Sequence, residues 1–221
     1  GLATTYSEFN RLFGGLRDGN VYAIVSRPAQ GKTTFINDLC LGAAIKNDVP
    51  VLVLDTEMSK EGHVNRLIAN ISGVPIHEVS TGKFVEDEVK NAKVQEAVEK
   101  LESIPYSYIS VAGKPFEQIL NLIRRWIVQE VKINESGKTN DCVIIYDYLK
   151  LMDSAEIRGD MKEFQVLGFM MTALHNFALR YEVPILSFVQ LNRDGINKET
   201  TDTASGSDRI IWLCSNFSIY K

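Results

Sequence analysis

The chain has 221 residues, of which 45% are hydrophobic and 24% charged, a composition typical of one globular domain. No apolar run is long enough to span a bilayer and the first residues lack a signal-peptide pattern, so we expect no membrane partner. The formal net charge of −4 by itself argues against nucleic acid as a partner, because phosphate neutralisation supplies most of that affinity. A ring of subunits can nevertheless concentrate a few basic loops in its pore.

The three cysteines, Cys40, Cys142 and Cys214, lie in or beside apolar segments. Their odd number and irregular spacing are not those of a disulfide framework. Buried, reduced thiols are therefore expected, and they favour the cytoplasm as the location of the protein.

The first strong signal along the chain joins a strand to a helix. After a short helix expected over residues 8–13, the apolar run Val21–Val25 predicts a buried strand. The chain then turns through Gly31-Lys32-Thr33 into a helix with apolar periodicity. Backbone amides at a helix N-terminus carry partial positive charge and accommodate polyphosphates. This stretch therefore predicts a phosphate loop.

The residue types in this loop suit ATP and Mg²⁺. Lys32 would reach the β- and γ-phosphates, and the Thr33 hydroxyl would ligate Mg²⁺. The strict pattern begins with Gly, where this chain has Ser26. The predicted nucleotide-binding residues are Ser26, Arg27, Pro28, Ala29, Gln30, Gly31, Lys32, Thr33 and Thr34.

The rest of the chain alternates short apolar strands with helices. Further strands are expected at residues 51–54, 106–111, 142–147, 184–189 and 210–214, and further helices at 59–73, 84–104, 116–131 and 161–181. This alternation predicts an α/β fold, with a mainly parallel central sheet and helices on both faces.

Polar residues stand where several of these strands end. Ligands of parallel sheets bind outside the carboxyl ends of the strands, so Glu57, Asp147, Gln190 and the phosphate loop should form one site. Asp147 would hold Mg²⁺ through water. Asp55 and Glu57, two residues apart on an extended strand end, should point to the same side, and either could activate the attacking water.

These motifs resemble those of the DnaB-type replicative DNA helicases and occur in the same order. The similar segments are the phosphate loop Ser26–Thr34, Asp55-Thr-Glu-Met (Ser-Leu-Glu-Met in the family), residues 73–82, Tyr146–Met152 and Val189–Arg193. Val189 departs from the family's Ser. The resemblance implies that residues 1–221 form a single RecA-like P-loop ATPase domain of the helicase C-terminal type. It also implies that Glu57 polarises the attacking water, with Lys32 and Gln190 as further catalytic residues, Gln190 sensing the γ-phosphate.

The resemblance further implies an ATP hydrolase that translocates on single-stranded DNA and unwinds duplex. Such enzymes act as hexameric rings, with a primase or a helicase loader as partner, in bacteria or for viruses in the host cytoplasm. Arg158, Arg193 and Lys198 lie in polar loops that could contact DNA phosphates in the pore; ordinary surface charge explains them equally well.

The same resemblance places a ring-joining linker before Gly1 and a trans-acting arginine finger after Lys221. We therefore expect residues 1–221 to be truncated at both ends, and on their own to be mainly monomeric and nearly inactive.

Two other functions stay open. One is a RecA-like or RadA-like recombinase, or another P-loop ATPase that forms rings or filaments. The other is a small-molecule kinase, which would need a lid with several arginines near the phosphates; the sequence shows no such cluster. DNA-stimulated ATP turnover separates the helicase from the kinase, and strand displacement separates it from a strand-exchanging recombinase.

Overall fold

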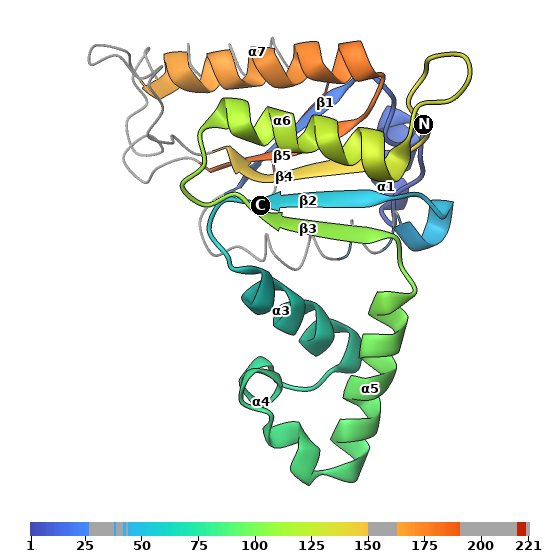
Figure 1. Cartoon of the computed structure of the whole chain (residues 1–221), viewed down its shortest axis with the longest axis vertical. Helices are drawn as coiled ribbons and strands as arrows, with labels where there is room; N and C mark the ends of the chain where they lie inside the picture. Colours follow the sequence, from blue (N-terminus) through green and yellow to red (C-terminus); the bar gives the residue numbers. More distant parts are fainter. Residues whose placement is uncertain (27–37, 39–41, 43, 150–162, 191–215, 220–221) are drawn as a thin grey trace.

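A six-stranded parallel sheet forms the centre of the protein (Figure 1). The structure is a computed structural model that describes residues 1–26, 38, 42, 44–149, 163–190 and 216–219. The strands are β1 (Val21–Ser26), β2 (Val51–Asp55), β3 (Tyr106–Ser110), β4 (Val143–Leu149), β5 (Ile185–Gln190) and β6 (Asn216–Ile219), in the spatial order β3-β2-β4-β5-β1-β6. Every neighbouring pair is parallel, which confirms the predicted α/β class. The strand expected at residues 210–214 lies outside the described residues.

The helices follow the predicted alternation, with differences at their ends and an additional helix at residues 76–81 that was not predicted. They are α1 (Ser7–Phe13), α3 (Lys60–Ser72), α4 (Ile76–Thr81), the 3₁₀ turn η1 (Lys83–Glu86), α5 (Glu88–Glu102), α6 (Phe116–Trp126), its π-helical continuation η2 (Ile127–Val131) and α7 (Glu163–Tyr181). The helix expected from residue 84 begins at Glu88 instead, because the Asp87 carboxylate caps it by accepting from the Val89 and Lys90 amides.

Both faces of the sheet are buried, as the continuous apolar runs of its strands require. Helices α6 and α7 cover one face (Figure 1), where Leu52 and Tyr146 pack with Ile123 and Leu174. Helix α1 and the helical residues 44–47 lie over the other face, whose core holds Tyr22, Ile24, Val51, Val53, Ile145, Leu186 and Phe188. Alternate residues of β1, β2, β4 and β5 thus belong to two different cores.

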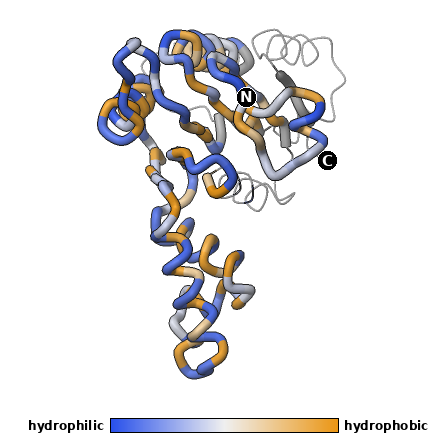
Figure 2. Tube along the Cα trace, turned by 90° about the vertical axis from the view of Figure 1, so that its right-hand side faces the viewer, coloured by the Kyte–Doolittle hydropathy of each residue, from blue (hydrophilic) through white to orange (hydrophobic). Residues whose placement is uncertain are grey.

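Between β2 and β3 the chain forms a helical extension of α3, α4, η1 and α5, which projects from the edge of the sheet (Figure 1). Apolar and hydrophilic residues alternate closely along it (Figure 2). A small core of its own, formed by Ile68, Val74, Val79, Val94 and Ala97, holds it together. Gly73 ends α3 in the left-handed conformation (φ 73°), which glycine adopts without steric cost.

The structure bears on the cysteines and on membrane-spanning helices. Cys142 is buried and unbridged, and burial raises the pKa of its thiol to about 12. Cys40 and Cys214 lie outside those residues. Among the described helices, none has both the length and the hydrophobicity needed to cross a bilayer.

His63 joins the helical extension to the sheet. Its ring lies 4.0 Å from that of Tyr108 at an interplanar angle of 12°, and it forms a hydrogen bond with the Tyr106 hydroxyl. The side chain is only 2% exposed, and this burial lowers its pKa from 6.5 to about 4, with the Asp55 charge opposing the shift and Arg66 adding to it. His63 is therefore neutral at physiological pH.

We predict that His63 makes folding stability pH-dependent below pH 6.5. Between pH 6.5 and pH 4 the unfolded chain binds the proton that the folded chain excludes, so the free energy of unfolding falls as pH falls. The contribution is at most about 1.4 kcal/mol per pH unit and vanishes above pH 6.5. The measurement is the free energy of unfolding, from denaturant titrations at several pH values, for the wild type and for His63→Phe, which keeps a stacking ring. This free energy should change less steeply with pH in the variant than in the wild type. An equal pH dependence in the two proteins would contradict the role of His63.

Candidate functional site

Three of the predicted site residues, Ser26, Asp147 and Gln190, lie at or near the carboxyl ends of their strands. Ser26, which ends β1, pairs in register with Gln190, which ends β5. Asp55, which ends β2, pairs in register with Asp147 of the neighbouring strand β4. Since all these strands are parallel, the four positions lie along one edge, as the strand-end argument predicted.

Asp147 stands at an irregularity of β4. This strand continues to Leu149, two residues beyond its predicted end, and its pairing with β5 shifts register between Tyr146 and Leu149. Such irregularities re-aim side chains and are frequent beside active sites. The Asp147 side chain is 8% exposed, and its carbonyl accepts a 2.9 Å hydrogen bond from the Thr56 amide. The backbone of Asp147 is thereby tied to the segment that follows β2.

The prediction that Asp55 and Glu57 point to the same side of an extended strand end is wrong. Strand β2 ends at Asp55, whose side chain is 5% exposed, whereas Glu57 is exposed. One carboxylate oxygen of Asp55, Oδ1, accepts hydrogen bonds from the backbone amides of Glu57 (2.8 Å) and Met58 (3.0 Å). This side-chain-to-backbone bonding bends the chain immediately after the strand, so the two carboxylates have different environments.

Several predicted site residues lie outside the described residues. They are the loop residues Arg27, Pro28, Ala29, Gln30, Gly31, Lys32, Thr33 and Thr34 and the basic residues Arg158, Arg193 and Lys198. Their roles stay predictions. For Ser26 and Gln190 the structure describes the backbone register alone.

Tyr108 is a further residue at this site that the sequence pattern did not single out. Its hydroxyl donates a 2.8 Å hydrogen bond to the carbonyl oxygen of Met58, in the bend that carries Glu57. Burial raises the pKa of the phenol above its usual range, and the charges of Asp55 and Asp147 raise it further. Tyr108 therefore keeps its proton and acts as a donor. The sequence did offer one indication of this role: Tyr106 and Tyr108 are two residues apart on β3, which places both rings on one face of the sheet.

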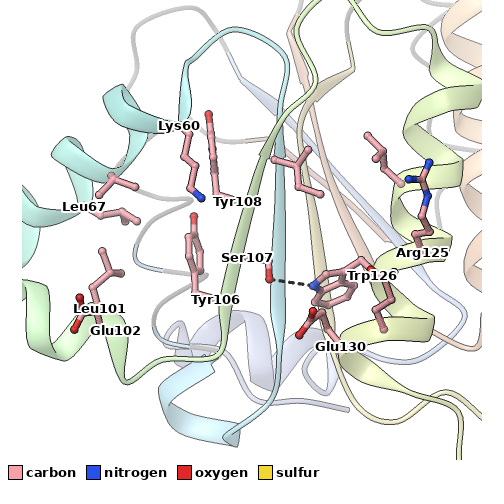
Figure 3. Close-up of a pocket in the computed structure, with 14 residues that line it drawn as sticks. Lys60, Leu67, Leu101, Glu102, Tyr106, Ser107, Tyr108, Arg125, Trp126 and Glu130 are labelled. Atoms are coloured by element: carbon pink, nitrogen blue, oxygen red, sulfur yellow. Dashed lines mark hydrogen bonds between the residues drawn. The ribbon is translucent and has the colours of Figure 1, made fainter.

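A separate cavity of about 520 Å³ lies along β3, which is an outer strand of the sheet (Figure 3). Lys60 and Tyr108 line it on the side of α3, and Arg125 and Trp126 line it from α6. The Trp126 indole N–H donates to the Ser107 hydroxyl at 3.1 Å. This cavity lies at the lateral edge of the sheet and does not coincide with the row of residues at the carboxyl edge.

Comparison with solved structures identifies the fold. The structure named "The Structure Of A DnaB-Like Replicative Helicase And Its Interactions With Primase" aligns with a TM-score of 0.81 at 17% identity, covering 100% of this chain and 51% of that one. The RadB recombinase aligns with a TM-score of 0.53 at 16% identity, covering 98% of this chain and 81% of that one. The fold is that of the RecA-like ATPase domains.

The sequence of this chain is similar to those of replicative DNA helicases. "Replicative DNA helicase DnaB" of Pasteurella multocida is 29% identical over 194 residues, which are 87% of this chain and 39% of the relative. The "Probable replicative DNA helicase" of Trieres chinensis is 23% identical over 198 residues, which are 90% of this chain and 41% of the relative. The chain thus spans about two-fifths of the length of these relatives.

A family model described as "DnaB-like helicase C terminal domain" matches residues 1–207, which is almost the whole chain. The parallel sheet, the register of the strand ends and the order of the motifs agree with this match. The chain therefore belongs to the family of DnaB-like helicase C-terminal domains.

Proposed function

We propose that this chain is the motor domain of an ATP-dependent replicative DNA helicase, which hydrolyses ATP to translocate on single-stranded DNA and unwind duplex. One observation carries the proposal: in a chain of this family, Ser26 aligns with Gln190 and Asp55 with Asp147 along one edge of a parallel sheet. That edge is where α/β proteins bind their ligands, and the phosphate-loop motif follows directly after Ser26.

The residues at this edge fit an ATP–Mg²⁺ complex. Mg²⁺ prefers carboxylate and hydroxyl oxygens, and we assign Asp147 and Thr33 to hold it, directly or through water. Asp147 lies at the register shift of β4, and the hydrogen bond from the Thr56 amide anchors its backbone. When bound, the metal neutralises charge on the phosphates. Lys32 would reach the β- and γ-phosphates from the loop.

Glu57 is the better candidate for polarising the attacking water. Asp55 is buried, and its Oδ1 already accepts two backbone hydrogen bonds. Glu57 stands on the exposed bend two residues later, and that bend is bonded to the backbone of Asp147. A base must come within hydrogen-bond reach of the water it activates, and an exposed carboxylate on a segment bonded to Asp147 supports this role.

Gln190 is proposed as the γ-phosphate sensor. Its backbone register places it beside Ser26, at the point where the chain enters the phosphate loop. A glutamine amide both donates and accepts, so it can respond to the presence of the γ-phosphate and pass that response to the residues after it.

The proposal includes the assembly and its partners. Arg158, Arg193 and Lys198 would contact single-stranded DNA in the pore of a hexameric ring, in bacterial or virus-infected cytoplasm. A primase or a helicase loader is the expected partner, since one of the similar structures is that of a helicase described with its interactions with primase.

The likeness to the RadB recombinase supports a second candidate, a ring- or filament-forming recombinase. Strand displacement by the full-length protein, without strand exchange, would favour the helicase.

In the full-length protein, Lys32→Ala should abolish DNA-stimulated ATP turnover and strand displacement, because the charge that binds the phosphates is lost. The fold should persist, as measured by circular dichroism and the unfolding midpoint. The matched control is Lys46→Ala, a change to an exposed lysine of the same chain whose ammonium bonds the Thr4 carbonyl at 3.4 Å. Normal turnover in Lys32→Ala would contradict the phosphate-loop assignment.

Glu57→Gln should preserve nucleotide binding but slow hydrolysis by about two or more orders of magnitude, because the amide cannot accept the proton. Single-turnover phosphate release and a nucleotide-binding titration would measure the two effects separately. Asp55→Asn serves as the control, since its amide oxygen can still accept the two backbone hydrogen bonds. If Asp55→Asn were the inactive variant and Glu57→Gln the active one, the catalytic carboxylate would be Asp55.

A further inference from the structure

Hydrogen bonds from two strands hold the bend that carries Glu57. Asp55 of β2 accepts from the Glu57 and Met58 amides at 2.8 and 3.0 Å. Tyr108 of β3 donates to the Met58 carbonyl at 2.8 Å. Side chains of the sheet therefore bind both the amide and the carbonyl groups of this bend.

The two ends of the bend are fixed as well. On the side of the sheet, the Thr56 amide donates to the Asp147 carbonyl at 2.9 Å. On the side of the helical extension, the Ser59 hydroxyl caps α3 by accepting from the Gly62 amide at 3.2 Å. Glu57 therefore stands on a short segment anchored to β4 at one end and to α3 at the other.

Burial strengthens the two central contacts. Asp55 is 5% exposed and Tyr108 is 8% exposed, and hydrogen bonds to a buried carboxylate are stronger than those between neutral groups. The Tyr108 ring also stacks on buried His63, which fixes the direction of its hydroxyl. Figure 3 shows the rings of Tyr106 and Tyr108 one above the other along β3, with Lys60 of α3 beside them.

A catalytic carboxylate on an exposed bend needs such support. A shift of about 1 Å in a reacting group can cost about 10²-fold in rate. The Glu57 side chain is exposed and is not packed into the core, so the backbone of the bend contributes to its position.

We propose that Asp55 and Tyr108 are positioning residues for hydrolysis, which hold the Glu57 bend beside Asp147. The inference rests on the proposed role of Glu57. Both act through the backbone of Glu57 and Met58, to which their side chains are bonded.

The test uses Asp55→Ala and Tyr108→Phe in the full-length protein. Each should lower kcat for ATP hydrolysis about 10- to 100-fold while leaving the KM and the nucleotide Kd unchanged, because the binding residues are untouched. Asp55→Asn, which retains an oxygen acceptor, should restore most of kcat. Tyr106→Phe is the matched control: it lies on the same strand and face, its hydroxyl bonds His63, and the variant should keep the normal kcat.

Hydrogen exchange gives a readout that does not depend on activity. The Glu57 and Met58 amides should exchange faster in Asp55→Ala than in the wild type or in Asp55→Asn, because their acceptor is removed. Thermal unfolding identifies variants that fail to fold. Tyr108→Phe loses one hydroxyl and keeps its ring, so it tests the proposal if Asp55→Ala proves unstable.

Double variants separate this inference from the proposed function. Adding Asp55→Ala or Tyr108→Phe to Glu57→Gln should cause no further loss of turnover, because a misplaced Glu57 and an absent one are equivalent. Equal losses with and without Glu57, or a normal kcat in both single variants while Glu57→Gln is inactive, would overturn the positioning role alone. Full activity in Glu57→Gln would instead contradict the catalytic role of Glu57 in the proposed function.

Discussion

The parallel pairing of strands buried on both faces is the constraint that determines where this protein can place its polar groups. A strand between two hydrophobic cores has no place for a charged side chain along its length. The carboxylates Asp55 and Asp147 accordingly stand at or near the ends of their strands. Because the strands run in one direction, Ser26, Asp55 and Gln190 end their strands at one edge, and Asp147 lies near it. The sheet thus brings together residues that are far apart in the sequence.

Helix α3 and buried side chains then hold the residues next to that edge in place. The helical extension between β2 and β3 begins with α3 at Lys60, so only four residues, 56–59, join the end of β2 to its start. His63, buried against the tyrosines of β3, links the extension to the sheet. The bend that carries Glu57 is therefore part of the packed structure, although Glu57 itself is exposed.

Much of this architecture was predictable from hydrophobic pattern. Runs such as Val51–Leu54 mark strands because both faces are buried, and strand-end residues follow from that assignment. The pattern failed where side chains bond to the backbone: Asp87 moves a helix start, and Asp55 bends the chain before Glu57. Hydrophobic periodicity does not show where a side chain will bond to the backbone and so interrupt a helix or a strand. His63 gave no signal either, because a single histidine on an amphipathic helix is compatible with either a buried or an exposed position.

The most direct test of the proposed ATP site is an experimental structure of the full-length protein with Mg²⁺ and a non-hydrolysable ATP analogue. We expect the γ-phosphate at the carboxyl edge of the sheet, with the metal bound by Asp147 and Thr33 and with Glu57 facing the γ-phosphate. A nucleotide bound elsewhere, for example in the cavity along β3, or a γ-phosphate out of reach of Glu57, would contradict this site.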